Sequence, residues 1–332
     1  MKKTVLFSFL LGSIFAFGQS GENVYPFLNI PVSAKQAALG GDAVSLRDHD
    51  VAMAIVNPTM LNEDSDMQLS LNGAAYLADS KYGTIAFAKE FENGHMASIN
   101  ARYMNYGDIP RTDESGMEMG SFTATDVAVG LGYAYRFEKD WTIGGGINFI
   151  TSKIDNYTSA AIAGTAAVSY HNRKNKETVA LVFRNFGYQF KSFNGTRENL
   201  PFRVDLGYTR IIPNFPLAIT LTAHDLQQLD ISSEYNNNGQ EVGIGRKIAD
   251  HFSIGAELFP EKSFQIRLGY NVKRGNELAV VDQRSFAGLS AGFGVKVANF
   301  KLDYAHVRYH NSTNVNQIGI SVDLSGLKRN TF

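Results

Sequence analysis

Residues 201–210 read PFRVDLGYTR, and this stretch shows the pattern on which the fold depends. Every second residue is apolar, and the residues between them are charged, small or polar. The apolar set is Phe202, Val204, Leu206 and Tyr208, and the other set is Arg203, Asp205, Gly207 and Thr209. A period of two residues is typical of a β-strand with one apolar face and one polar face.

The same alternation recurs along most of the chain. It is clear in residues 265–273 (QIRLGYNVK) and in residues 317–324 (QIGISVDL). The pattern predicts fourteen strands: 67–77, 82–91, 96–106, 124–137, 141–152, 159–171, 177–188, 201–210, 217–225, 251–259, 264–274, 285–297, 300–310 and 317–324.

The connections between these strands alternate in length. Six of them are short: 92–95, 138–140, 172–176, 211–216, 260–263 and 298–299. Most of the others are longer and polar: 107–123, 189–200, 226–250 and 275–284. Bacterial outer-membrane barrels have an even number of strands, with short periplasmic turns and longer external loops. The alternation therefore predicts such a barrel with both ends on the periplasmic side.

A soluble β-sandwich or soluble barrel is the alternative, because period two alone does not say which face is buried. Three features favour the membrane: strands of 9–13 residues, polar faces rich in Arg, Asp, Asn and Gly, and aromatic residues near strand ends. These aromatics are Tyr106, Phe137, Trp141, Tyr188, Phe259 and Phe300. We predict an all-β transmembrane antiparallel β-barrel of about 14 strands over residues 67–325, followed by a periplasmic tail at 326–332.

The N-terminus has the features of an export signal. Lys2 and Lys3 precede an apolar run at residues 4–17, and small or polar residues follow at 18–20. We predict a signal peptide over residues 1–20 and hence the cell outer membrane as destination; the alternative is a buried N-terminal helix. With 0 Cys, the chain forms no disulfide and offers no site for lipoprotein acylation. A net charge of −1 gives no case for nucleic-acid binding.

Residues 21–66 do not alternate. Residues 33–46 (SAKQAALGGDAVSL) predict a short helical turn broken at Gly40 and Gly41, and Asn57-Pro58 predicts a turn. The apolar content of the segment predicts burial as a plug, or hatch, inside the barrel. The alternative is a loose periplasmic tail.

No motif in the sequence carries enzymatic chemistry, so we predict a non-enzyme without cofactor or metal. Asp48-His49-Asp50 is read as a solvated loop, with metal binding as the alternative. His306 and Ser321 fall on opposite strand faces and so form no hydrolase pair. The glycines at 144–146 lie inside a predicted strand, where small residues let the wall curve or a plug approach closely.

The sequence resembles a known family in its N-terminal segment and first long loop. Residues 27–31 (FLNIP), 33–41 (SAKQAALGG) and 57–61 (NPTML) look like the opening of Bacteroidetes outer-membrane barrels related to the FadL-like long-chain fatty-acid transporter fold. The more specific segments are 106–108 (YGD), 113–116 (DESG), 120–122 (GSF) and 199–202 (NLPF). Together they resemble the PorQ family of the type IX secretion system.

The resemblance implies protein secretion rather than catalysis. Members of this family anchor a surface protein, PorZ, in an attachment complex with the sortase PorU and a second barrel, PorV. The expected partners are therefore outer-membrane lipid and PorZ-like, PorU-like and PorV-like proteins. Candidate partner-contact residues, chosen because they lie in long polar loops, are Tyr106, Asp108, Asp113, Glu114, Phe122, Asn194, Asn199 and Tyr235. The alternative function is a FadL-like transporter of hydrophobic small molecules, with the plug gating the path.

Overall fold

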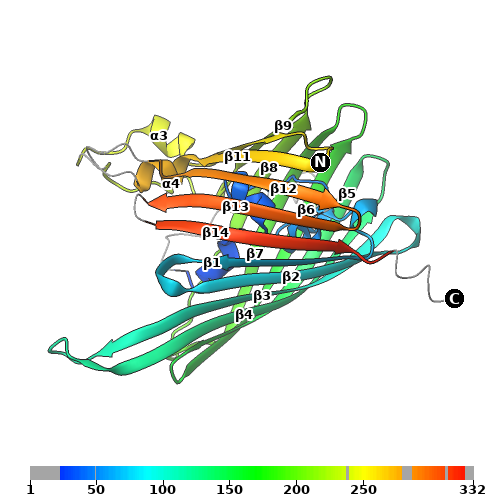
Figure 1. Ribbon diagram of the computed structural model, residues 1–332. Helices are drawn as coiled ribbons and strands as arrows, with labels where there is room; N and C mark the ends of the chain where they lie inside the picture. Colours follow the sequence, from blue (N-terminus) through cyan, green and yellow to red (C-terminus); the bar gives the residue numbers. More distant parts are fainter. Residues whose placement is uncertain (1–22, 49, 237–238, 279–285, 311–312, 326–332) are drawn as a thin grey trace, which may run out of the picture.

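The chain folds into a closed barrel (Figure 1). The structure, a computed structural model, describes residues 23–48, 50–236, 239–278, 286–310 and 313–325. Within these residues fourteen strands pair antiparallel with their sequence neighbours, and the last strand pairs with the first. The predicted all-β barrel of about fourteen strands is confirmed. The strands are β1 (Gln68–Ala75), β2 (Lys81–Glu90), β3 (His95–Thr112), β4 (Glu118–Arg136), β5 (Trp141–Ile154), β6 (Tyr157–Asn172), β7 (Glu177–Lys191), β8 (Arg203–Ile211), β9 (Leu217–Ala223), β10 (Phe252–Leu258), β11 (Phe264–Asn271), β12 (Leu289–Val297), β13 (Phe300–His310) and β14 (Thr313–Asp323).

The barrel has two different ends. Short connections follow β2, β4, β6, β8, β10 and β12, and β1 begins and β14 ends at the same side; we call this the turn end. The opposite side, where β3 and β4 meet and where the segments after β7, β9 and β11 lie, is the loop end. The turn end also carries two short 3-10 elements of its own, η4 (Glu63–Ser65) and η6 (Glu92–Gly94).

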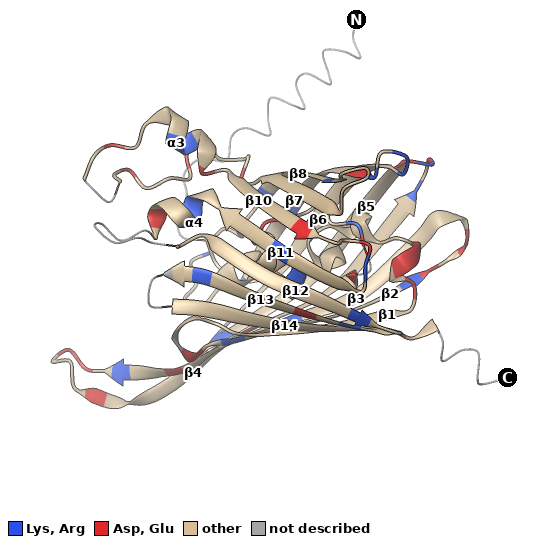
Figure 2. Ribbon diagram, turned by 45° about the horizontal axis from the view of Figure 1, so that its top comes forward, with Lys and Arg blue, Asp and Glu red and all other residues tan. Residues whose placement is uncertain are grey.

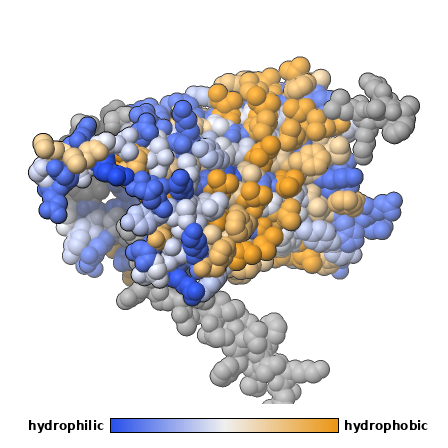
Figure 3. Space-filling model, turned by 90° about the horizontal axis from the view of Figure 1, so that it is seen from below, coloured by the Kyte–Doolittle hydropathy of each residue, from blue (hydrophilic) through white to orange (hydrophobic). Residues whose placement is uncertain are grey.

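The side chains of the wall alternate in the sense that a lipid-facing barrel requires. On β14, Ile318 and Ile320 are 51% and 44% exposed, whereas Gln317 and Ser321 are buried. On β8, the charged residues Arg203 and Asp205 are buried, whereas Leu206, between Asp205 and Gly207, is 42% exposed. Figure 3 shows the result as an apolar belt between two hydrophilic ends. A water-soluble barrel would show the reverse, with apolar residues inside and polar residues outside.

Exposed aromatic residues collect at the turn end, where they border the apolar belt. Almost every short turn contributes one: Phe91, Phe137, Trp141, Phe215, Phe259, Phe264 and Phe300 are all at least 40% exposed. Tyr188 is exposed on the loop-end half of β7. Aromatic girdles of this kind occur where a transmembrane barrel crosses the membrane–water interfaces.

Tyr106 does not belong to this girdle, and that prediction is wrong. Its hydroxyl donates a hydrogen bond of 2.7 Å to the buried carboxylate of Asp126, so the ring is turned inward. The register of β3 against β4 shifts between Asn105 and Asp108, and Gly107 has a φ of 74°. On β3 the buried Arg102 and Met104 lie on the same face as Tyr106, so the alternation itself turns this side chain inward. The girdle prediction rested on its place near a strand end and not on its face.

The prediction of a long loop at 107–123 is also wrong, because most of these residues belong to strands. β3 runs on to Thr112 and β4 starts at Glu118, so only a tight turn remains between them. The two strands form a hairpin that projects well beyond the rest of the wall (Figure 1). Its outer part pairs with neither β2 nor β5, because those pairings stop at Asn105 and Ala124.

Two short helices stand at the loop end. α3 (Ile244–Ala249) lies in the segment between β9 and β10, which was predicted as a loop. α4 (Val272–Glu277) directly follows β11, so the predicted strand 264–274 ends earlier than expected. η5 (Leu77–Asp79) joins β1 to β2. Within the described residues, no helix is both long and apolar enough to cross a membrane.

The segment before β1 is built from short turns of helix. They are η1 (Pro26–Asn29), α2 (Ala34–Ala38), η2 (Val51–Ile55), η3 (Pro58–Met60) and η4. The Ser33 side chain caps α2 by accepting a hydrogen bond from the Gln36 amide, and Gly40 and Gly41, both with φ above 90°, follow its end. The Asn57 side chain caps η3 in the same way. The predicted helical turn and the Asn57-Pro58 turn are therefore confirmed.

This N-terminal segment lies against the inner face of the wall (Figure 1). The hydroxyl of Thr84 on β2 donates to the Val32 carbonyl at 2.8 Å, and the hydroxyl of Ser290 on β12 donates to the Ala38 carbonyl at 3.0 Å. On β3, next to β2, the Arg102 guanidinium donates to the Leu28 carbonyl at 2.9 Å. These bonds satisfy backbone groups that would otherwise be buried without a partner.

Candidate functional site

The lumen is the most highly organised polar region of the molecule, and its contents come from both the wall and the N-terminal segment. Charged side chains occur at inward positions of β7, β8, β10, β11 and β13. Three of them, Arg203, Glu257 and Lys301, pair with a charged residue of the N-terminal segment, so the two parts are joined by ion pairs as well as by packing.

The first group, which we call the Lys35 cluster, joins α2 to three strands. The Lys35 ammonium lies 2.5 Å from the Asp48 carboxylate and 3.0 Å from the Glu257 carboxylate on β10. Glu257 also pairs with Arg267 at 2.8 Å, and Arg267 pairs with Asp303 on β13 at 2.5 Å. Apart from Asp48, every side chain in this chain of contacts is 6% exposed or less. Removing one member would leave a buried charge without its partner.

The second group, the Arg203 cluster, holds the residues after Gly41. The Arg203 guanidinium on β8 pairs with Asp42 at 2.8 Å and with Asp205 at 3.2 Å. Asp205 is fully buried and also pairs with Arg184 on β7 at 2.7 Å. Asp42 in turn accepts a hydrogen bond of 2.7 Å from the Asn271 side chain on β11. Asp42 therefore links β8 to β11, which are separated by two strands in the wall.

The third group, the Glu63 cluster, lies at the turn end. The Glu63 carboxylate accepts hydrogen bonds from Arg136, the last residue of β4, and from Arg173, the residue after β6. It also lies 3.6 Å from the Arg47 guanidinium. Burial alone would raise the pKa of Glu63, but the hydrogen bonds from Arg136 and Arg173 outweigh it and lower the pKa to about 2. Glu63 is therefore ionised at neutral pH and ties the last turn before β1 to the wall.

Inward-facing glycines allow the segment to come this close. A Cβ atom on Gly269 of β11 would lie 2.2 Å from the Gly40 amide nitrogen, and one on Gly144 of β5 would lie 3.1 Å from Pro58 and Thr59. The first distance is far below any contact that a real side chain makes. The close approach expected at residues 144–146 is thus present at Gly144.

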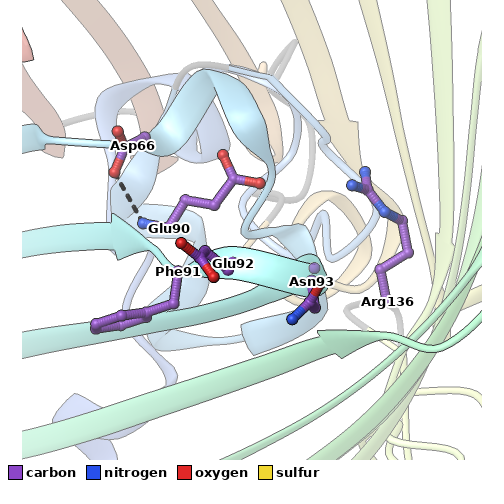
Figure 4. A pocket seen from close by; sticks show the side chains of 7 residues that line it. Asp66, Glu90, Phe91, Glu92, Asn93 and Arg136 are labelled. Atoms are coloured by element: carbon purple, nitrogen blue, oxygen red, sulfur yellow. Dashed lines mark hydrogen bonds between the residues drawn. The ribbon is translucent and has the colours of Figure 1, made fainter.

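Two pockets in the described part of the chain lie at the turn end, and both are lined mainly by polar side chains. One, with a volume of ≈ 660 Å³, is lined by Asp66, Glu90, Phe91, Glu92, Asn93, Gly94 and Arg136. Figure 4 shows Asp66 against the backbone of Glu90, joined by a hydrogen bond of 2.8 Å, with Arg136 across from them. A second pocket of ≈ 380 Å³ lies between Glu63 and the β12–β13 turn. Binding sites for apolar ligands are mostly lined by hydrophobic side chains, and these two are not.

Among the described residues, no three His, Asp or Glu side chains are grouped so that they could hold a metal ion. His49, the centre of the Asp48-His49-Asp50 run, lies outside the described residues. Asp48 instead pairs with Lys35, and the Asp50 side chain caps η2. His306 and Ser321 do face opposite sides of the wall, because Ser321 is buried in the lumen and His306 is on the outward register.

The predicted partner-contact residues fall into three separate places. Five are on the β3–β4 hairpin: Tyr106, Asp108, Asp113, Glu114 and Phe122. Of these, Asp113 and Glu114 are exposed at its tip, whereas Tyr106 points inward. Asn194 and Asn199 are exposed in the segment after β7, where the Asn199 carbonyl accepts a hydrogen bond from the Val24 amide. Tyr235 is 56% exposed in the segment after β9.

Sequence reasoning missed the three ion clusters. It identified Arg203, Asp205 and Arg267 as members of polar strand faces, which is the signal that they enter the lumen. Their partners in the N-terminal segment could not be inferred, because Arg203 and Asp42 are separated by 161 positions in the sequence. Only the closure of the barrel brings them together.

Comparison with known proteins gives relatives in structure only. No protein-family model and no curated sequence matches the chain. The Pseudomonas putida toluene transporter TodX is 11% identical, covering 88% of this chain and 97% of its own, with a TM-score of 0.53. A TodX deltaS2S3 mutant, described as a monoaromatic hydrocarbon channel, is 11% identical, covers 87% of this chain and 96% of its own, and has a TM-score of 0.56. A Pseudomonas aeruginosa FadL homologue is 10% identical, covers 88% of this chain and 98% of its own, and has a TM-score of 0.52.

At these identities the likeness shows the fold alone. The chain thus has the fold of the FadL-like outer-membrane barrels, which confirms the coarser part of the resemblance seen in the sequence. Membership of the PorQ family finds no support among these matches and remains a prediction.

Proposed function

We propose that this chain is an outer-membrane barrel that acts as a non-enzymatic scaffold, with its lumen closed by the N-terminal segment. The observation that carries the proposal is the set of ion pairs across the lumen. Lys35 and Asp42 each reach buried charges on the wall, and the polar side chains facing inward are buried against the segment. A lumen filled in this way suits a rigid anchor.

The membrane location is supported by the wall itself. Its outward positions carry the large apolar residues, and the aromatic residues at the turn end border that belt (Figure 3). A continuous exposed apolar belt of this kind is costly in water and is stabilising in lipid. By the usual arrangement of such barrels, the turn end faces the periplasm and the loop end faces the outside.

The β3–β4 hairpin is the part of the loop end best placed to meet a partner. It projects from the wall and carries charges of both signs near its tip (Figure 2). Between positions 108 and 122 it has four carboxylates, Asp108, Asp113, Glu114 and Glu118, and one guanidinium, Arg111, for a net charge of −3. A partner with a basic surface fits this hairpin. By the resemblance described above, that partner is a PorZ-like surface protein of a type IX attachment complex.

A pull-down from detergent-solubilised outer membranes of the native cells tests the scaffold. In the test variant, residues 108–121 are replaced by a two-residue turn, and Lys174→Ala at the turn end is the control. The wild type and the control should retain the surface partner, and the hairpin variant should release it while the barrel stays in the membrane fraction. Undiminished capture by the hairpin variant would contradict the assignment of the hairpin as the contact.

A transporter of hydrophobic small molecules is the second candidate, and the comparisons favour it more than they favour secretion. TodX is named for the transport of toluene, and the fold is shared. The wall also has a discontinuity: β7 pairs with β8 only up to Arg184 and Arg203, and beyond that point β7 runs on to Lys191 without β8 beside it. Such an edge could admit a ligand from the side if the N-terminal segment moved.

Uptake measurements separate the two candidates. Cells with and without the chain are compared for uptake of labelled toluene and labelled oleate. The scaffold predicts equal uptake in both strains, together with loss of the surface partner in the strain that lacks the chain. Transport predicts reduced uptake in that strain, with the partner still in place.

A further inference from the structure

The outer face of the wall at the loop end of β5, β6 and β7 carries a group of basic side chains. Lys153 on β5 is exposed and pairs in register with Thr158 on β6. The Lys191 ammonium at the end of β7 donates to the hydroxyl of the same threonine at 2.5 Å. Lys153 on β5 and Lys191 on β7 thus stand on either side of Thr158 on the outer face of the barrel.

A third cation lies over the outer face of β7. The Arg197 guanidinium lies over the ring of Tyr188, 4.6 Å from its centroid, and Tyr188 is 50% exposed on the outer face of β7. In the part of the chain that the structure describes, none of the three cations has a carboxylate partner. The nearby Asp155 is paired with Arg111 at 2.6 Å.

Directly below the cations the wall is aromatic and apolar. Phe149 and Phe190 are 53% and 49% exposed, and their ring centroids are 5.9 Å apart. Ile162 and Tyr188 extend this surface on β6 and β7. We name the combined feature the Lys153 patch: Lys153, Lys191 and Arg197 above Phe149, Phe190 and Tyr188.

The patch lies at the depth of a lipid headgroup. Lys153 follows Trp141 by twelve residues on β5. At about 3.3 Å per residue and a strand tilt of about 40°, Lys153 is roughly 30 Å above the turn-end aromatics, which is about the thickness of a hydrocarbon core. The aromatics beneath it therefore meet acyl chains, and the three cations meet the headgroups of the outer leaflet.

We propose that the Lys153 patch binds a phosphorylated glycolipid of the outer leaflet, with its phosphates on Lys153, Lys191 and Arg197 and its acyl chains on the aromatic surface. Charge complementarity selects an anionic headgroup, and guanidinium and ammonium groups are the usual ligands of phosphate. The inference rests on the membrane location proposed above, but it is independent of the scaffold and transport candidates.

Binding of bis-phosphorylated lipid A to the purified full chain in detergent tests the inference, with dephosphorylated lipid A and inorganic phosphate as the other two probes. We expect tight binding of bis-phosphorylated lipid A, weaker binding of dephosphorylated lipid A and no binding of inorganic phosphate. The triple variant Lys153→Gln, Lys191→Gln, Arg197→Gln should weaken the first by roughly tenfold to a hundredfold. Equal affinity for the phosphorylated and dephosphorylated lipids would overturn the inference, as would binding of phosphate alone.

A matched control removes the same charge from the other end of the barrel. The variant Lys139→Gln, Lys174→Gln, Lys262→Gln changes three exposed lysines in turn-end connections, and it should bind the lipid like the wild type. The variant Lys153→Arg, Lys191→Arg should retain binding, which separates loss of charge from loss of folding. Equal weakening in the control triple would refute a specific patch. Recovery of the chain as a soluble monomer without detergent would instead refute the membrane location itself.

Discussion

At the scale of single residues, Lys35 shows how the lumen is held together. It is almost completely buried, and it faces two carboxylates, Asp48 in the N-terminal segment and Glu257 on β10. A buried ion pair adds little net stability over an apolar pair, but losing one partner is costly because the other charge stays buried. The residue therefore fixes where α2 sits in the lumen.

Lys35→Met should destabilise the protein by about 3–5 kcal/mol, because both carboxylates then lose their shared cation. Urea unfolding of the chain folded into lipid vesicles measures the change in unfolding free energy. Lys174→Met, an exposed position in the β6–β7 turn, is the matched control and should change it by less than about 0.5 kcal/mol. Similar effects of the two variants would contradict the role given to Lys35.

Glu63 predicts a dependence on pH. Its folded-state pKa of about 2 lies below the ordinary value of 4.5, so its ionised form stabilises the folded state at pH values above about 4.5. That contribution is lost as the pH falls through the window from about 4.5 to about 2. Glu63→Gln should therefore lower the thermal unfolding midpoint at pH 7 and leave it unchanged near pH 2. The idea fails if the difference between variant and wild type persists at pH 2.

At the scale of elements, the strands and the N-terminal segment fit each other through glycines. Gly269 faces inward at a point where the backbone of Gly40 leaves no room for a side chain. Gly73 on β1 also lies in the wall but faces outward, and the nearest heavy atom to its Cβ position is 4.0 Å away. The two glycines therefore form a matched pair of test sites.

Gly269→Leu should push the N-terminal segment away from β11, whereas Gly73→Leu should leave it in place. Limited proteolysis in vesicles detects the difference, because a displaced segment is cut around residues 40–60 while the barrel resists. Equal protection of the segment in both variants would show that the close approach at Gly269 does not position it.

The alternation of side chains allowed the strands to be predicted from the sequence, because lipid outside and a packed polar lumen impose opposite demands on the two faces. The outer half of the β3–β4 hairpin was missed, since it extends beyond the wall and neither of its faces has to be apolar. Tyr106 was misplaced because the prediction rested on its position near a strand end, whereas its strand face is the inward one that carries Arg102 and Met104. The alternation of side chains thus predicts the strands of the wall, but it does not predict the structure of segments that extend beyond the wall.

The candidate site was less accessible to sequence reasoning than the fold. The inward charges Arg203 and Arg267 could be recognised from their strand faces, but their contacts with Asp42, Glu257 and Asp303 depend on strand order and register. The Lys153 patch likewise requires three strands to stand side by side, because its cations come from β5, the end of β7 and the following loop.

At the scale of the whole molecule, the barrel combines a closed interior with two unlike ends. The interior joins wall and N-terminal segment through buried charges, the turn end is compact, and the loop end extends into the hairpin and the segments around α3 and α4. Because the N-terminal segment is paired to the inner face of the wall, we place the specific contacts proposed above at the loop end and on the lipid-facing wall.

All of these inferences require that the apolar side chains of the wall face lipid. Because the chain has 0 Cys, single cysteines can be placed along β14 from position 317 to 321 and labelled with a nitroxide in protein reconstituted into lipid vesicles. Collision rates with oxygen, which concentrates in lipid, and with a water-soluble nickel chelate then report each environment. The labels at 318 and 320 should meet oxygen far more often than those at 317, 319 and 321. A flat profile, or the opposite alternation, would contradict the account.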